Sequence, residues 1–211
     1  MNIQKSAAYD EVLQRVKSGQ QYLDIGCCMG QDIRKLVYDG ASSENIYASD
    51  LKSQFWDIGY ELFLDKSSLK ATFIEADVFD ENSGLQPLTG TIDIVHAASF
   101  FHLFDWDGQV AAAKKIVSLL NPESDSLILG RQAGRAEAGD FTARVEQTKS
   151  RYWHNPESFA KLWKHVGDET GTNWKVEADF DEQTDLFRNK CGMADFIPQD
   201  TKFMRFIIRK A

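Results

Sequence analysis

The 211-residue sequence has few cysteines, no extended basic run and no long apolar segment, and each shortage excludes a class of protein. Its three cysteines are an odd number and two of them, Cys27 and Cys28, are adjacent, which suits neither a disulfide framework nor a zinc site. Lys and Arg never form a run longer than a pair and the net charge is -8, so a nucleic-acid substrate is not indicated. No stretch approaches the ~18 apolar residues of a membrane span. A soluble, cytoplasmic protein in a reducing compartment is therefore expected.

Length and hydrophobic content predict one folded unit. A chain of 211 residues with 43% hydrophobic content can bury a full core, and residues 1–211 are expected to form a single domain. Helical spacing of apolar residues predicts a helix over 8–17, within an N-terminal helical segment 1–20 that is expected to pack on the sheet edge. Further apolar segments predict strands alternating with helices, the strands being 22–25, 46–49, 71–75, 92–95 and 127–129.

This alternation predicts an α/β fold with parallel strands and right-handed crossovers. Two later strands, 174–180 and 203–209, have no helix between them and are expected to pair antiparallel. The predicted fold class is thus a Rossmann-like, doubly wound, seven-stranded sheet, mostly parallel with an antiparallel last strand. Polar residues 131–154 are expected to form a long connection or a helix over the carboxyl edge of the sheet, and 132–154 and 181–201 are predicted to be substrate-side segments. Asn155 and Pro156 predict the start of another helix.

A glycine turn follows the first strand in the sequence YLDIGCCMG, from Tyr22 to Gly30. A strand, a tight turn and a helix N-terminus in succession tend to bind nucleotide-like ligands. A dinucleotide fingerprint would need glycine at Gly26, Cys28 and Gln31, and two of these three glycines are absent. The dinucleotide interpretation is therefore excluded, and the pattern that remains is D-x-G-x-x-x-G.

Two acids end the next two strands. Asp50, 26 residues after Asp24, stands where an open α/β nucleotide fold places the carboxylate that accepts both ribose hydroxyls. Asp77 follows the third strand, where its carboxylate could accept a hydrogen bond from an adenine amine. A simpler role for Asp77, as a helix N-cap or turn residue, fits the same position.

The chain contains, in order, LDIGCCMG, ASD, EAD, IDIVHAASFFHLF and an expected antiparallel last strand, which together cover residues 22–209. This succession resembles the class I S-adenosylmethionine (SAM) methyltransferases, whose seven-stranded sheet ends in such a reversed strand. Within that family, GCCMGQDIRKLVYDGA, HAASFFHLFDWDGQ, ILGRQAG and HNPESFAKLW are similar to the small fungal methyltransferases of meroterpenoid and polyketide pathways, of the austinol type. The resemblance implies methylation of a secondary-metabolite intermediate. Such proteins usually have a longer segment before the glycine turn than the 21 residues here, so a second subunit, as in a homodimer, is one way to close the pocket.

When the family's SAM-binding positions are matched to this sequence one by one, the resemblance implies that residues at the ends of the first four strands bind SAM. Those residues are Asp24, Gly26, Cys27 and Gly30 at the methionine part, Asp50 and Leu51 at the ribose and adenine, Asp77 and Val78 at the adenine ring, and His96 and Ala97 beneath the reacting end. For the two adjacent cysteines, packing is preferred to thiol chemistry.

The acceptor chemistry rests on histidines and arginines. A phenol or enol hydroxyl, such as that of a pyrone, must lose a proton, and a positioned histidine contributes ~10²- to 10⁴-fold. His102, in the aromatic loop after the fourth strand, is the predicted base, with simple packing as its alternative, and His154 is a second candidate at the substrate. A carboxylate or acidic enol needs no base but favours a cationic clamp, for which Arg131, Arg135 and Arg144 are available.

Absent motifs exclude two other kinds of methyltransferase. The loop HAASFF is not the N/D-P-P-Y loop that nucleic-acid amino-methylation requires. Metal-dependent transfer needs clustered carboxylates, and this region offers only Asp105 and Asp107, at the expected start of a helix, so no metal is predicted. The expected partner is a small-molecule acceptor, without nucleic acid or membrane. SAM binding without methyl transfer, in a cyclase or a regulatory protein, stays open.

Overall fold

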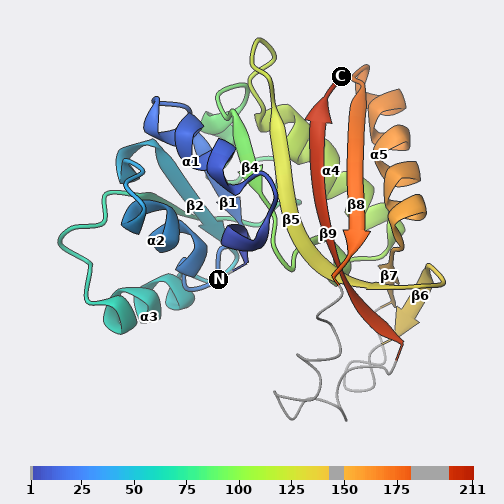
Figure 1. Ribbon diagram of the computed structural model, residues 1–211, viewed down its shortest axis with the longest axis horizontal. Coiled ribbons are helices and arrows are strands. Elements are labelled where there is room, and N and C mark those ends of the chain that lie inside the picture. The colour runs from blue at the N-terminus through green and yellow to red at the C-terminus, as the bar shows by residue number, and fades with distance from the viewer. Residues whose placement is uncertain (1, 143–149, 182–199) are drawn as a thin grey trace.

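A central sheet of seven strands organises the chain (Figure 1), in the order β3-β2-β1-β4-β5-β9-β8. β9 is antiparallel to both of its neighbours, and the pairs on the other side of β5 are parallel. The computed structural model describes residues 2–142, 150–181 and 200–211. The strand bounds are β1 Tyr22–Ile25, β2 Ile46–Asp50, β3 Thr72–Glu75, β4 Ile94–His96, β5 Leu127–Arg135, β8 Trp174–Phe180 and β9 Thr201–Lys210.

Helices cover both faces of this sheet, which gives three layers (Figure 1). One face carries α1 (Tyr9–Lys17), α2 (Gln31–Tyr38) and α3 (Ser53–Phe63), and the other carries α4 (Trp106–Leu119) and α5 (Pro156–Thr170). Short 3-10 turns complete the described part, namely η1 (Ile3–Lys5), η2 (Ser43–Asn45), η3 (Gln86–Leu88) and η4 (Phe101–Leu103). No helix in the described ranges is long and apolar enough to cross a membrane.

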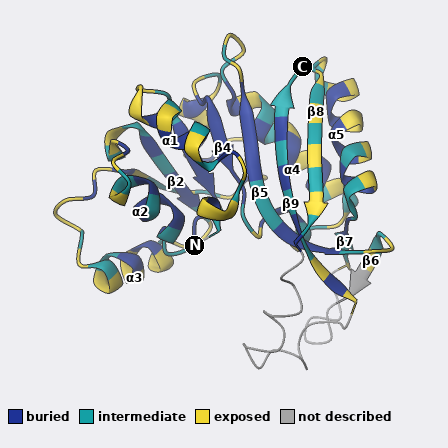
Figure 2. Ribbon diagram, viewed as in Figure 1, coloured by how far each residue is buried: buried dark blue, intermediate teal, exposed yellow. Residues whose placement is uncertain are grey.

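Side-chain alternation along the strands builds a core on each face. Tyr22 packs with α1 and α2, whereas its neighbour Leu23 packs with α4 and α5, because successive side chains of a strand point to opposite faces. The central strands β1 and β4 are buried on both sides, as their dark ribbons in Figure 2 show, while the edge strand β8 alternates between partly buried and exposed residues. Central strands therefore read as continuous apolar runs in the sequence.

The predicted architecture is confirmed in its main features. The parallel strands, the antiparallel pair of β8 with β9, and the helix start at Asn155 are present, and the Asn155 side chain accepts the backbone N–H of Ser158 in a capping box. The expectation that the first helix packs on the sheet edge is wrong. Val12 and Val16 of α1 are fully buried in the same cluster as Leu127 and Leu129 of β5, so α1 lies on the face of the sheet.

The prediction for residues 131–154 is also wrong. β5 continues to Arg135, paired with β9 along nine residues, and β6 (Gly139–Thr142) and β7 (Ser150–Trp153) form a separate antiparallel pair. Long-range pairing with β9 overrides the low strand propensity of Gly130 and Gly134. Arg144, Cys191 and most of the 181–201 segment lie outside the described residues.

Candidate functional site

The turn between β1 and α2 is held in a conformation that most residues avoid. Gly26, Cys28 and Gly30 all have positive φ angles, of 70°, 51° and 65°. A side chain at Gly26 would come within 3.0 Å of the Phe100 ring, and one at Gly30 would come within 2.3 Å of Trp56. The glycines thus allow the left-handed turn and close packing around it. Cys28 adopts the same conformation in place of a glycine, with its N–H donated to Asp50 Oδ2 at 2.9 Å.

A cavity of about 390 Å³ opens at the carboxyl ends of β1, β2, β3 and β4. The strand order reverses between β1 and β4, and open α/β sheets bind ligands at such a switch point. Five of the residues predicted to bind the cofactor line this cavity, namely Gly26, Asp50, Leu51, Asp77 and Val78. The loop after β4 supplies the facing wall through Ser99, Phe100, Leu103 and Phe104.

The two acids of the cavity both anchor local backbone. Asp50 holds the glycine turn through Cys28 and also accepts the N–H of Lys52 at 3.2 Å. Asp77 Oδ1 accepts the N–H of Phe79 at 2.9 Å, which is the turn role that the sequence left as its alternative. The Asp77 side chain still lines the cavity, so the turn contact and a ligand contact are compatible.

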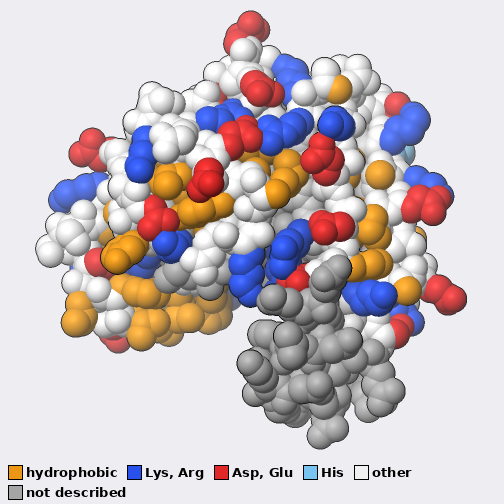
Figure 3. All heavy atoms as spheres, viewed as in Figure 1, with side chains coloured by type: hydrophobic (Ala, Val, Ile, Leu, Met, Phe, Trp, Pro, Cys, Tyr) orange, Lys and Arg blue, Asp and Glu red, His pale blue; other side chains and the backbone are white. Residues whose placement is uncertain are grey.

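Exposed apolar side chains surround the cavity mouth. Leu51 is 56% exposed, Phe55 43%, Phe79 46% and Leu103 46%, and all four line the cavity. Figure 3 shows that apolar side chains also gather at the lower left, over α3, where Ile58 and Leu62 are exposed beside Phe55. Large apolar side chains left in water around a concave site indicate a binding site for a ligand with apolar surface.

The other five predicted cofactor residues do not line this cavity. Gly30 precedes α2 as its N-cap, and Ala97 is fully buried with its N–H donated to Leu129 O. Cys27 is buried, and burial raises the pKa of its thiol, which fits packing and not thiolate chemistry. Asp24 and His96 are buried against each other.

Asp24 and His96 face one another across the parallel strands β1 and β4. Asp24 Oδ1 lies 2.9 Å from His96 Nδ1, and both side chains are almost completely buried. Burial opposes the charge on His96, but the carboxylate of Asp24 outweighs it, so the pKa of His96 is raised. The pKa of Asp24 is also raised, because burial disfavours its carboxylate more than the nearby His96 favours it.

His102, the predicted base, lies in η4 beside β7. Its ring is 6.3 Å from that of Trp153, and the Trp153 indole N–H donates to its backbone oxygen at 3.2 Å. Burial, together with the charge of Arg151, lowers the pKa of His102 to about 4. His102 is not among the residues that line the cavity, whereas the next residue, Leu103, is.

His154 and Arg131 occupy very different surroundings. His154 is fully buried among Trp106, Tyr152 and Phe159, its Nδ1 lies 2.8 Å from Ser158 Oγ, and burial lowers its pKa to about 4. Arg131 lies at the carboxyl edge, 3.7 Å above the ring of Phe203, with Asp181 at 3.6 Å.

Sequence reasoning missed Arg205, which lies beside Arg131. The two residues are register partners on β5 and β9, and Arg205 forms an ion pair with the same carboxylate, Asp181, at 2.7 Å. Two guanidinium groups thus share one carboxylate at this edge. The pairing of strands 74 residues apart brings them together, so no local signal in the sequence could have found Arg205.

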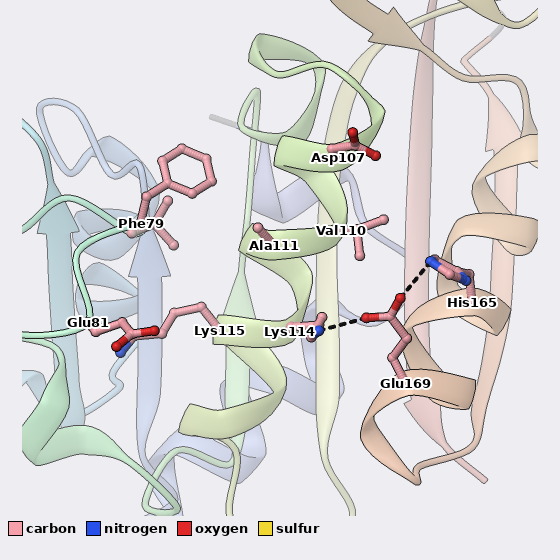
Figure 4. A pocket seen from close by; sticks show the side chains of 10 residues that line it. Phe79, Glu81, Asp107, Val110, Ala111, Lys114, Lys115, His165 and Glu169 are labelled. Carbon is pink, nitrogen blue, oxygen red and sulfur yellow. Dashed lines mark hydrogen bonds and ion pairs between the residues drawn. The ribbon is translucent and has the colours of Figure 1, made fainter.

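A second groove, of about 550 Å³, lies between α4, α5 and the loop after β3 (Figure 4). Three of its polar side chains contact one another, because Glu169 pairs with Lys114 at 2.6 Å and with His165 at 2.9 Å. These ion pairs are exposed and contribute little. The groove shares Val78 and Phe79 with the cavity.

Comparison with known proteins places this geometry in a family. The methyltransferase domain family (Methyltransf_25) matches residues 23–123. The O-methyltransferase phiE of Fungal sp. (strain ATCC 74256) is 47% identical over 97% of this chain and 71% of its own length. The methyltransferase adrK of Penicillium rubens is 44% identical over 84% of this chain and 64% of its own length. The chain thus spans about two thirds of the length of these relatives.

Solved structures agree on the fold. The Burkholderia thailandensis 1,6-didemethyltoxoflavin-N1-methyltransferase, solved with S-adenosylhomocysteine, has a TM-score of 0.64 at 12% identity, over 99% of this chain and 80% of that one. The [4+2]-cyclase SpnF has a TM-score of 0.66 at 13% identity, over 96% of this chain and 81% of that one. Because one fold serves both a methyltransferase and a cyclase, the fold alone does not assign the chemistry.

The cavity fits SAM. Its two acids offer acceptor oxygens, which hydroxyl and amine donors require, and the exposed side chains of Leu51, Phe79 and Leu103 offer apolar surface. SAM supplies an electrophilic methyl group on a sulfonium. Site geometry and sequence identity over almost the whole chain agree, and the chain therefore belongs to the class I SAM-dependent methyltransferases and, within them, to the fungal methyltransferases of polyketide and meroterpenoid pathways.

Proposed function

We propose that the protein transfers the methyl group of SAM to a hydroxyl, a phenol or an enol such as a pyrone hydroxyl, on a polyketide or meroterpenoid intermediate. The observation that carries this proposal is the 47% identity with an O-methyltransferase over 97% of the chain. The apolar rim formed by Leu51, Phe79 and Leu103 supports an apolar ligand environment.

In this proposal the chain acts mainly by positioning. Gly26, Asp50, Leu51, Asp77 and Val78 hold the cofactor against the carboxyl ends of the strands. Alignment of an acceptor behind the methyl group supplies most of the rate, because effective molarities for such alignment reach about 10⁵ M or more. The aromatic loop after β4 excludes water from the reacting groups.

His102, the base predicted from sequence, is one candidate to accept the hydroxyl proton. At neutral pH a histidine with a pKa of about 4 is unprotonated and so is free to accept a proton, but it is a weaker base than an ordinary histidine. Trp153 of β7 holds the backbone of His102 through its indole N–H.

Carboxyl methylation is the second candidate. Arg131 and Arg205 share the single carboxylate of Asp181, which leaves one positive charge in excess among these three groups. Paired guanidinium groups are suited to bind a carboxylate or an acidic enol, which is already ionised at pH 7 and needs no base.

One experiment separates these functions. The protein is incubated with methyl-labelled SAM and, in parallel, with methyl 2,4-dihydroxybenzoate, 2,4-dihydroxybenzoic acid and 4-hydroxy-6-methyl-2-pyrone. Label that survives mild base on an aryl oxygen supports hydroxyl methylation, whereas label released as methanol supports carboxyl methylation. Methylation of a nitrogen or carbon acceptor in a wider set, with none on oxygen, would overturn the proposal.

A further inference from the structure

A buried ionisable pair joins Asp24 of β1 to His96 at the end of β4. Asp24 and His96 are 3% and 1% exposed, and both lie within strands of the central sheet. Burying two such groups costs desolvation energy, and well-packed apolar residues often replace them without loss of stability. Buried pairs with perturbed pKa values gather at functional sites.

The hydrogen bond between them fixes which ring nitrogen is basic. An ionised Asp24 can only accept, so the neutral His96 ring carries its proton on Nδ1, toward Oδ1 at 2.9 Å. Its lone pair is then on Nε2. This is the arrangement in which a carboxylate orients a histidine as a general base.

The His96 ring lies between Asp24 and a small cavity at the carboxyl edge. β4 has β1 on one side, where Asp24 lies, and β5 on the other, which contributes Leu129, Gly130 and Arg131 to the cavity. Arg205 also lines it, and the N-terminal turn covers it with Asn2, Ile3 and Ser6. The volume is about 10 Å³, which holds one water molecule at most.

We propose that His96, oriented by Asp24, is the catalytic base for the acceptor hydroxyl, and that the acceptor enters where the N-terminal turn 2–6 now covers Arg131 and Arg205. This inference rests on the proposed hydroxyl methylation. It changes the role that the sequence suggested for these two residues, from cofactor binding to proton transfer for His96 and to positioning for Asp24.

The step balances in atoms and charge. His96 Nε2 takes the proton of the acceptor hydroxyl as the acceptor oxygen bonds to the methyl carbon, and the electron pair of the breaking carbon–sulfur bond discharges the sulfonium. The positive charge passes to the imidazolium, next to the Asp24 carboxylate at 2.9 Å. The proton then leaves to water once the N-terminal turn opens.

The electrostatics of the histidines support this choice. Asp24 raises the pKa of His96, so its ring is a stronger base than a free histidine, while burial lowers the pKa values of His102 and His154 to about 4. Five residues from four elements bear on the His96 charge, namely Asp24 and Tyr22 of β1, Asp32 of α2, Arg131 of β5 and Arg205 of β9.

The first test needs no acceptor. Long-range ¹H–¹⁵N spectra of the ¹⁵N-histidine-labelled protein with S-adenosylhomocysteine report the protonated ring nitrogen, and the signal missing in His96→Gln identifies the residue. We expect a neutral ring protonated at Nδ1 that titrates above pH 6.5. A neutral ring protonated at Nε2 overturns the proposal, because it leaves no lone pair for the acceptor proton.

The second test separates a base from a cofactor ligand. His96→Gln should bind S-adenosylhomocysteine within about threefold of wild type by calorimetry, yet lose about 100-fold or more in kcat on the hydroxyl probe. His165→Gln, on the exposed surface of α5, is the matched control. If His96→Gln loses S-adenosylhomocysteine affinity but keeps a normal kcat, His96 is a cofactor ligand and not the base. If only His102→Gln loses about 100-fold in kcat, His102 is the base.

The positioning role of Asp24 predicts a change in the pH profile. The rate rises with pH as His96 loses its proton, and Asp24→Asn removes the carboxylate that raises the pKa of His96. The rising limb of kcat/KM should therefore move to lower pH, with a smaller plateau. An unmoved limb overturns this role, and absence of wild-type activity on every hydroxyl acceptor would instead count against the proposed function.

Discussion

The Asp50 carboxylate accepts the backbone N–H of Cys28 at 2.9 Å, so the acid that ends β2 holds the turn that follows β1. Two parts of the cofactor cavity, 22 residues apart in the chain, are thereby fixed relative to each other. Cys28 adopts a φ of 51° at this point, a conformation that a non-glycine residue maintains only when its surroundings hold it there.

Replacing Asp50 should weaken cofactor binding. Asp50→Ala removes the proposed acceptor of the ribose hydroxyls and also frees the turn, so calorimetry should show S-adenosylhomocysteine affinity lower by ~1–3 kcal/mol, or roughly 5- to 150-fold. Asp57→Ala, an exposed position on α3, is the control. Unchanged affinity in Asp50→Ala would contradict the ribose assignment.

Two glycines with the same backbone angle separate strain from packing. Gly30 and Gly171 have φ angles of 65° and 66°, but a side chain would meet Trp56 at 2.3 Å in the first case and nothing within 4 Å in the second. Gly171→Ala should cost ~1–2 kcal/mol from the left-handed conformation alone. Gly30→Ala should cost a further ~1–3 kcal/mol from overpacking. Equal free energies of unfolding in urea for the two variants would show that Trp56 and Arg34 move aside without strain.

The parts of this site that could be predicted from sequence are those encoded locally. Asp50 and Asp77 were identified because each follows its own strand, and the same spacing places Gly26 in the turn. Local patterns also gave the start of α5 at Asn155, because capping depends on residues within one turn.

The parts that escaped prediction depend on contacts between distant residues. Asp24 and His96 are 72 residues apart, and only the register of β1 with β4 brings them together. The strand character of 131–135 escaped for the same reason, because Gly130, Gln132 and Gly134 give a polar, glycine-rich pattern that pairing with β9 overrides. Arg205 was missed because its partner Arg131 lies on another strand.

The lowered pKa of His154 predicts that the folded protein loses stability in acid. Its pKa is about 4 in the folded protein, below the ordinary value of 6.5, so the unfolded chain binds the proton more readily. Stability should therefore fall as pH drops below 6.5, with the loss complete near pH 4, and His154 alone should account for about 2 kcal/mol by pH 5. Urea unfolding at pH 7.5 and pH 5 measures the difference.

A matched pair of variants isolates the contribution of His154 to the pH dependence of stability. His154→Asn keeps a hydrogen-bonding group near Ser158 and removes the titrating ring, so its stability should change less between the two pH values than that of wild type. His165→Asn, on the exposed face of α5, serves as the control. An identical pH dependence in wild type and His154→Asn would mean that His154 has the same pKa in the folded and the unfolded chain.

The N-terminal turn should be released by a single change in α2. Asp32 Oδ1 accepts the N–H groups of Asn2 and Ile3 at 2.6 and 3.1 Å, and Asp32 is almost fully buried. Asp32→Ala removes this anchor, leaving two backbone donors without their partner at a cost of ~1–3 kcal/mol. Because that loss falls on the turn, trypsin should cleave after Lys5 at least several-fold faster than in wild type. If the turn covers the acceptor site, the same variant should also expose His96 to diethyl pyrocarbonate, which Asp39→Ala at the opposite end of α2 should not do. Faster cleavage after Lys5 with His96 still protected would show that the turn opens without uncovering His96, and the acceptor would then have to enter by another route.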